Sequence, residues 1–151
     1  MVYGFQVVFD AADPPRLARF WQQALGYVEE APPQGYDSWD DFLVRNEIPE
    51  SDRDRMGSAV PPDFDVATGG GSRPRLLFVR VPEGKTVKNR LHLDIAVGGD
   101  RSTPRQERWP RILARAAQLE ELGATRVREH EEPGSRWLVM ADPEGNEFCV
   151  H

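Results

Sequence analysis

The stretch 137–150, WLVMADPEGNEFCV, contains the strongest turn signal in the chain. The residues on either side of the turn, 137–141 and 147–150, are largely apolar, as is typical of strands. Between them, residues 142–146 are Asp, Pro, Glu, Gly and Asn, which favour a tight reversal of the chain. We therefore predict two strands joined by this turn.

The preceding residues predict a strand over 89–97, a helix and a strand over 125–131. Alternation in 89–97 places Arg90, His92 and Asp94 on one face of the strand. The other face is predicted to pack under the helices and consists of Leu91, Leu93, Ile95 and Val97. The helix is predicted to begin near Thr103-Pro104 and to end at Gly123.

The first half of the chain has the same order of elements. A strand over 5–9 precedes a helix that begins at Asp13-Pro14 and ends at Gly26. Strands are predicted over 27–31, near 57–61 and over 75–81, with a helical insert in 34–56 and a flexible hairpin at the glycines 69–71. The fold class is therefore α+β, with two βαβββ modules, about 1–82 and about 87–151, in a single domain over 1–151.

Charge and composition exclude several classes of partner. The formal net charge of −6 repels phosphate backbones, which argues against nucleic acid and against an anionic membrane surface. No apolar run approaches the roughly 20 residues of a membrane helix, and the N-terminal residues lack the pattern of a signal peptide. Cys149 is the single cysteine, as is typical of a reducing compartment. We expect a cytoplasmic protein.

Three segments resemble the vicinal oxygen chelate superfamily, and within it the glyoxalase-like and bleomycin resistance protein-like domains. They are residues 5–26, residues 87–94 and residues 137–146, and the Asp-Pro-Glu-Gly-Asn turn is the most specific. The resemblance implies a cupped eight-stranded mixed sheet of the glyoxalase/bleomycin-resistance/dioxygenase type. It further implies a small-molecule pocket in the cup between the two modules, and a homodimer, which is common in the superfamily.

The resemblance also implies positions for metal ligands on the first and last strand of each module. Three of them fall on Gln6, His92 and Cys149, and the fourth falls within Phe78 to Arg80, where there is no Asp or Glu. Both carboxylates that metal-dependent members lead us to expect are therefore absent. We expect no functional metal; if an ion such as Zn, Ni, Mn or Fe binds, its ligands are Gln6, His92 and Cys149.

His92 is the candidate catalytic residue, because an imidazole near Asp94 suits a general acid or base. Arg90 and Asp94 either pair with each other around His92 or bind a polar ligand. Aromatic walls for the pocket are expected from Trp39, Phe42 and Trp137. The remaining candidates for the ligand pocket are Gln6, Phe78, Arg80, Arg90, Asp94 and Cys149.

Three functions stay open at this point. The first is a metal-free protein that binds a small organic molecule, with or without mild acid–base chemistry at His92. The second is a divalent-metal-dependent lyase, isomerase or dioxygenase of the same superfamily. The third is a non-enzymatic regulatory or drug-sequestering module. The absence of both expected carboxylates favours the first, and the sequence leaves open whether the protein is an enzyme.

Overall fold

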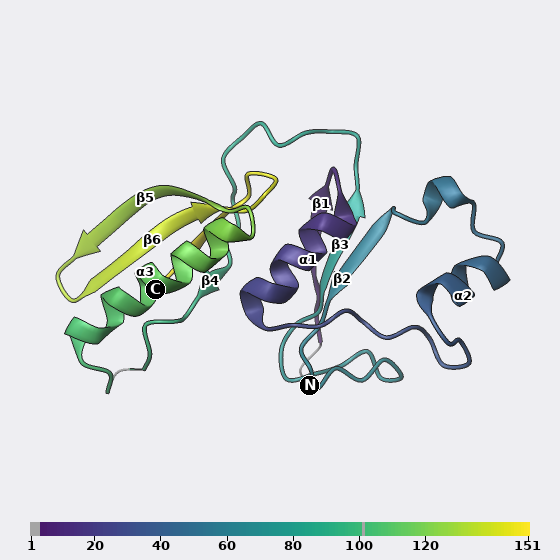
Figure 1. Ribbon diagram of the computed structural model, residues 1–151, viewed down its shortest axis with the longest axis horizontal. Helices are drawn as coiled ribbons and strands as arrows, with labels where there is room; N and C mark the ends of the chain where they lie inside the picture. The colour runs from purple at the N-terminus through teal and green to yellow at the C-terminus, as the bar shows by residue number, and fades with distance from the viewer. Residues whose placement is uncertain (1–3, 101) are drawn as a thin grey trace. The chain divides into compact units, whose positions relative to one another are not determined.

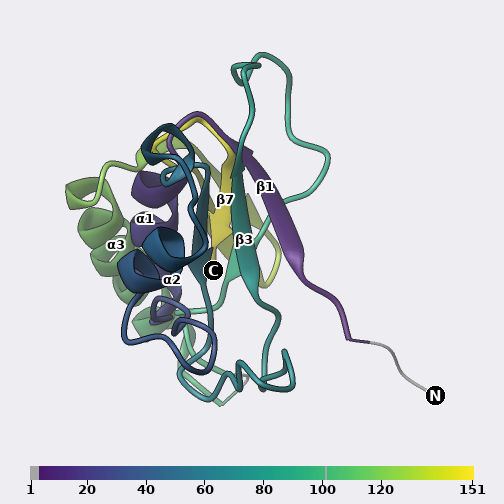
Figure 2. The same cartoon turned by 90° about the vertical axis from the view of Figure 1, so that its right-hand side faces the viewer.

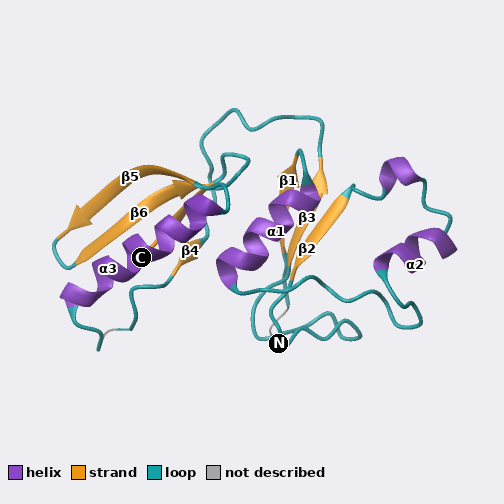
Figure 3. Cartoon of the chain, viewed as in Figure 1, coloured by secondary structure: helices purple, strands orange, loops and turns teal. Residues whose placement is uncertain are grey.

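The computed structural model describes residues 4–100 and 102–151. The chain divides into two compact units, Met1–Gly84 and Lys85–His151, each with helix and sheet (Figures 1 and 3). This confirms the predicted α+β class. Within the described residues, none of the helices has the length and apolar character needed to span a membrane. The cupped arrangement of the strands stays a prediction.

The sheet of the first unit has three strands in the order β1-β3-β2. β1 (Val7–Ala11) runs parallel to β3 (Leu76–Arg80), and β2 (Met56–Ala59) runs antiparallel to β3. Helix α1 (Pro14–Leu25) lies against one side of these strands (Figure 2). Gly57 permits this packing, because a Cβ there would lie 2.5 Å from the carbonyl oxygen of Pro14.

Helix α1 begins and ends as its sequence predicts. The Asp13 carboxylate accepts a hydrogen bond of 3.1 Å from the backbone N–H of Arg16, and Gly26 ends the helix in the left-handed conformation with φ of 68°. The buried face that packs on the sheet includes Leu17, Phe20, Trp21 and Ala24. These apolar side chains supply the core of the first unit.

The predicted strand over 27–31 is wrong, because only Val28 pairs, in an isolated bridge with Val60. If the strand continued, Glu30 would pair with Ser58 through the two backbones. Instead, the backbone N–H and carbonyl of Glu30 form hydrogen bonds with side chains. Its N–H donates to the Ser58 hydroxyl, and its carbonyl accepts from the Trp39 indole at 2.6 Å. Side-chain hydrogen bonds therefore replace backbone strand pairing at Glu30. The segment that follows contains α2 (Trp39–Arg45) and the short 3-10 helix η1 (Glu50–Asp52), both inside the predicted helical insert.

The sheet of the second unit has four strands in the order β4-β7-β6-β5. They are β4 (Asp94–Ile95), β5 (Thr125–Glu132), β6 (Ser135–Ala141) and β7 (Glu147–Val150). Helix α3 (Arg105–Glu121) lies along this sheet and buries Ile112, Ala116 and Leu119 (Figure 1). β4 is parallel to β7, whereas the pairs β7–β6 and β6–β5 are antiparallel.

The predicted strand over 89–97 is correct only at Asp94–Ile95. Before it, the side-chain oxygen of Asn89, and not a backbone carbonyl, accepts the N–H of Glu147 at 3.1 Å. The residues between Asn89 and β4 are irregular, and the predicted apolar face fails there, since Leu91 is 65% exposed. Ile95 alone of that face is buried.

The predicted turn between β6 and β7 is confirmed, and it is built on the carboxylate of Asp142. Asp142 is 3% exposed. Its Oδ1 accepts the backbone N–H groups of Glu144 and Asn146, both at 2.9 Å, and the Asn146 side-chain amide donates to both carboxylate oxygens. Several donors therefore offset the cost of burying one negative charge.

Replacing Asp142 by alanine should lower the free energy of unfolding by about 2–4 kcal/mol, because several part-buried N–H donors of the turn lose their common acceptor. Urea unfolding followed by fluorescence measures this loss. Asp65→Ala is the matched control: Asp65 also accepts a backbone N–H two residues ahead, from Ala67 at 2.9 Å, but in an exposed loop. That variant should lose less than about 1 kcal/mol. Equal losses in the two variants would contradict the role given to the buried turn.

Candidate functional site

The second sheet has one face that carries polar side chains. Along β7, Phe148 and Val150 are fully buried among the core residues, while Glu147 and Cys149 alternate to the opposite side. Cys149 pairs with Asp94 of β4 and with Val139 of β6, so side chains of three strands meet on this side. We call it the polar face.

Glu147 is the centre of the strongest charge cluster on the polar face. The Lys88 ammonium donates to its Oε2, and His92 Nε2 lies 3.6 Å from the same oxygen. The hydrogen bond from Lys88 lowers the pKa of Glu147, and the charges of Lys88, His92 and Arg128 act in the same direction. A lysine and a histidine therefore converge on one carboxylate oxygen. An imidazole beside a carboxylate can exchange a proton with a bound molecule.

Cys149 and Asp94 form a second pair on the same face. Burial raises the pKa of the Cys149 thiol to about 11, and the charge of Asp94 and its hydrogen bond to the thiol act in the same direction. The thiol therefore remains protonated at neutral pH and donates to the Asp94 carboxylate. This geometry gives Asp94 a partner other than Arg90, the partner that the sequence suggested.

An aromatic pair lies further along the polar face. The His130 and Trp137 rings stack across β5 and β6, with centroids 5.1 Å apart and an interplanar angle of 10°. Arg128 Nε donates to His130 Nε2 at 2.6 Å. Trp137, predicted as an aromatic wall, thus lies on the same face as Cys149, with a cationic side chain beside it.

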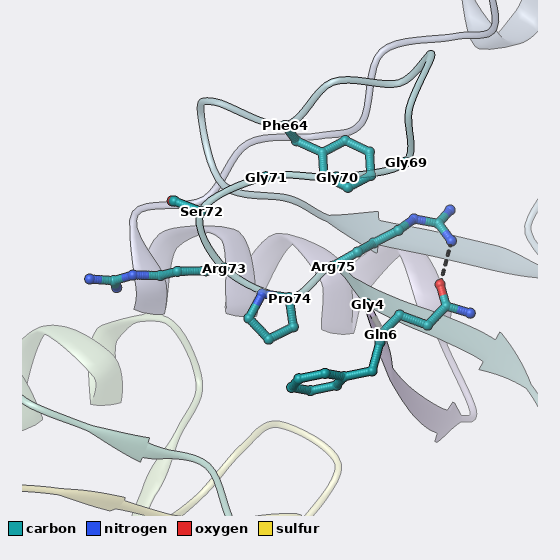
Figure 4. Close-up of a pocket in the computed structure, with 11 residues that line it drawn as sticks. Gly4, Gln6, Phe64, Gly69, Gly70, Gly71, Ser72, Arg73, Pro74 and Arg75 are labelled. Atoms are coloured by element: carbon teal, nitrogen blue, oxygen red, sulfur yellow. Dashed lines mark hydrogen bonds between the residues drawn. The ribbon is translucent and has the colours of Figure 1, made fainter. Parts of the chain in front are cut away.

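Gln6 lies in the first unit, at a pocket of about 600 Å³. Arg75 donates to Gln6 Oε1 at 2.8 Å and to Glu30 at 2.7 Å. Figure 4 shows the Phe64 ring beside the loop of residues 69–71, with Gln6 and Arg75 meeting below it. The predicted hairpin is held by its own side chains, since Asp63 accepts both the N–H and the hydroxyl of Ser72.

The other predicted pocket residues of the first unit lie elsewhere. Phe78 is fully buried and stacks on Phe9 with ring centroids 5.1 Å apart, which makes it a core residue and corrects its assignment to the pocket. Arg80 is exposed at the end of β3. Trp39 and Phe42 contact each other edge to face within the helical insert, with centroids 5.6 Å apart. They are half-buried and do not line the pocket at Gln6.

Sequence reasoning missed Glu147 and Lys88. It expected a carboxylate at position 149 and took the cysteine there as its loss. Glu147 lies two residues earlier on β7 and therefore on the same face. The period of two could have identified Glu147, but nothing in the sequence pairs it with Lys88, 59 residues away.

The Cys149 thiol should react slowly with a disulfide reagent at pH 8. Its pKa of about 11, against an ordinary value of 9.0, lowers the thiolate population about 100-fold. Reaction with Ellman's reagent in native and urea-unfolded protein measures the difference, which we expect to be at least about 100-fold. Asp94→Asn should make the difference between the native and unfolded rates smaller, because it removes the negative charge that helps to raise the pKa of the thiol. Equal rates in the native and unfolded protein would contradict the buried, protonated thiol.

Comparison with known proteins identifies the fold. Residues 6–151 match the family model of the glyoxalase-like domain. No curated protein matches the chain.

Solved structures with a similar fold include two proteins whose bound or target molecules are named. The fosfomycin resistance protein FosX from Mesorhizobium loti is 15% identical, with a TM-score of 0.57 over 100% of this chain and 92% of that one. The bleomycin-binding protein from Streptomyces verticillus, complexed with copper(II)-bleomycin, is also 15% identical, with a TM-score of 0.50 over 99% and 95%.

A third similar structure contains a metal. It is a mutant FosX from Listeria monocytogenes complexed with Mn(II) and 1S,2S-dihydroxypropylphosphonic acid, 11% identical, with a TM-score of 0.58 over 100% of this chain and 90% of that one. At such identities the likeness concerns the fold. The family match confirms the predicted resemblance to glyoxalase-like domains: the chain belongs to the glyoxalase-like domain family.

Proposed function

We propose that the protein binds a small organic molecule on the polar face of its second sheet, without a divalent ion, and that His92 is the proton-exchanging group. The observation that carries the proposal is the convergence of Lys88 and His92 on Glu147. Small-molecule sites combine apolar lining with a few convergent polar groups. Val139 and Cys149, both buried, lie between this cluster and the aromatic pair His130–Trp137, whose rings provide the apolar part here.

The chemistry of the donors does not fit the metal that some members of the superfamily use. The Cys149 thiol, one of the expected ligands, is already engaged in a hydrogen bond with the Asp94 carboxylate. Glu147 already binds the ammonium of Lys88. Among residues 4–100 and 102–151, no three side chains of His, Cys, Asp or Glu are grouped so as to hold an ion. We therefore assign no step to a metal.

The similar structures support a small molecule as the ligand. One of them is a complex with copper(II)-bleomycin, and another is a complex with a phosphonic acid. A planar group would suit the aromatic pair, and an oxygen anion would suit Arg128 and Lys88. Whether the bound molecule is transformed or only sequestered depends on the proton exchange at His92.

A thermal-shift screen tests the proposal, with chelator-treated protein and a panel containing fosfomycin, bleomycin and aromatic carboxylic acids. A ligand at 100 times its Kd stabilises by about 2.7 kcal/mol, which corresponds to a Tm rise of roughly 5–10 °C for a chain of this size. At least one compound should give such a shift. Failure of every compound would favour a regulatory or interaction module.

Three matched variants assign the binding surface. Glu147→Gln should change the shift, because it removes the carboxylate that holds Lys88 and His92, whereas Glu121→Gln, at the exposed end of α3, should preserve it. Gly70→Leu adds a side chain to a residue that lines the pocket at Gln6, where a Cβ meets no atom closer than 3.7 Å. If Gly70→Leu abolishes the shift and Glu147→Gln leaves it unchanged, the ligand binds in the first unit and the proposal is wrong. Near-stoichiometric metal in protein purified without chelator would contradict its metal-free part.

A further inference from the structure

We infer that Lys88 is the resident cation of the Glu147–His92 cluster, and that its ammonium takes the place of a divalent ion there. The inference rests on the proposed metal-free function and deepens it, because it assigns to a side chain the positive charge that would otherwise come from a metal. It also names the ligand class: a small organic acid whose oxygen anion accepts a hydrogen bond from Lys88.

The positions of the three groups carry the inference. Lys88 Nζ contacts Glu147 Oε2, and His92 Nε2 lies 3.6 Å from that oxygen. An ion held by this carboxylate oxygen would compete with the ammonium, which already contacts the same atom. The backbone N–H of Glu147 is also held, by the side chain of Asn89. The segment that carries Lys88 and His92 is thus fastened to β7 at two points.

A lysine in this position excludes an ion for two reasons. An ammonium has three donor N–H groups and no lone pair, so it cannot be a ligand. Its charge also repels a second cation, and in water a unit charge about 4 Å from a divalent ion weakens binding roughly 30-fold. The same ammonium can still bind a ligand. Its contact with Glu147 uses one of three donors, and the Lys88 side chain is 56% exposed.

The test is to convert the cluster into a metal site. In Lys88→His, an imidazole lone pair replaces the ammonium, and His, His and Glu form a common ligand set for zinc. In Lys88→Ala, the repulsion alone is removed. We expect untagged, chelator-treated protein titrated calorimetrically with Zn²⁺ or Ni²⁺ to bind at least about 30-fold more tightly in Lys88→Ala than in wild type, and more tightly again in Lys88→His.

Two control variants locate the gained site. The chain has only two lysines, and Lys85→His introduces the same imidazole three residues away, where it should add no comparable affinity. Glu147→Gln combined with Lys88→His should return the affinity to the wild-type value. The inference is overturned if neither Lys88 variant binds the ion more tightly than wild type, or if the gain survives Glu147→Gln.

The metal titration of the Lys88 variants and the thermal-shift screen can fail independently, so they test the role of Lys88 and the proposed function separately. If the screened compounds stabilise chelated wild-type protein but the Lys88 variants gain no metal, the role of Lys88 is wrong and the proposed function stands. If wild type itself binds one ion tightly, the metal-free function fails first. If the variants gain metal and no compound stabilises the protein, Lys88 keeps its role as a cation, and the assignment of an organic acid as the ligand is overturned.

Discussion

The buried carboxylate of Asp142 is the constraint on which the second unit depends. Its hydrogen bonds from Glu144 and Asn146 close the turn between β6 and β7 and thereby set the register of β7. In that register Phe148 and Val150 are buried, while Glu147 and Cys149 lie on the polar face. A slip of one residue would exchange the two sets. One turn therefore determines both the apolar core and the position of the groups that carry the chemistry.

The polar face then balances its own charges. Two of its carboxylates have partners within the unit: Asp94 accepts from the Cys149 thiol, and Glu147 accepts from Lys88. The pairing with Lys88 offsets the cost of partly burying the Glu147 carboxylate. What remains for a ligand is the imidazole of His92, the spare donors of Lys88 and Arg128, and the aromatic pair. These groups suit recognition of an organic anion, which is the basis of the proposed function.

The sequence predicted the features that depend on local chemistry and missed those that depend on distant partners. The helix cap at Asp13, the helix end at Gly26 and the turn at Asp142 were predictable, because each depends on interactions between residues close together in the sequence. The alternation of residues predicted a regular strand before Asp94, and this prediction is wrong. At Asn89 the side-chain oxygen, instead of a backbone carbonyl, accepts the N–H of Glu147. The pairing of Lys88 with Glu147 follows from that irregular segment. Phe78 was misplaced because alternation does not say which face of β3 meets α1.

The ionisation of Glu147 tests the account most directly. Titration of the side-chain carboxyl carbons by NMR, with the Glu147 signal assigned from Glu147→Gln, gives its pKa. Because the Lys88 ammonium favours the charged form, we expect a midpoint below the ordinary glutamate value, rising toward that value in Lys88→Met. The same titration in Lys85→Met should leave the midpoint unchanged. An ordinary midpoint in wild type, insensitive to Lys88→Met, would contradict the cluster.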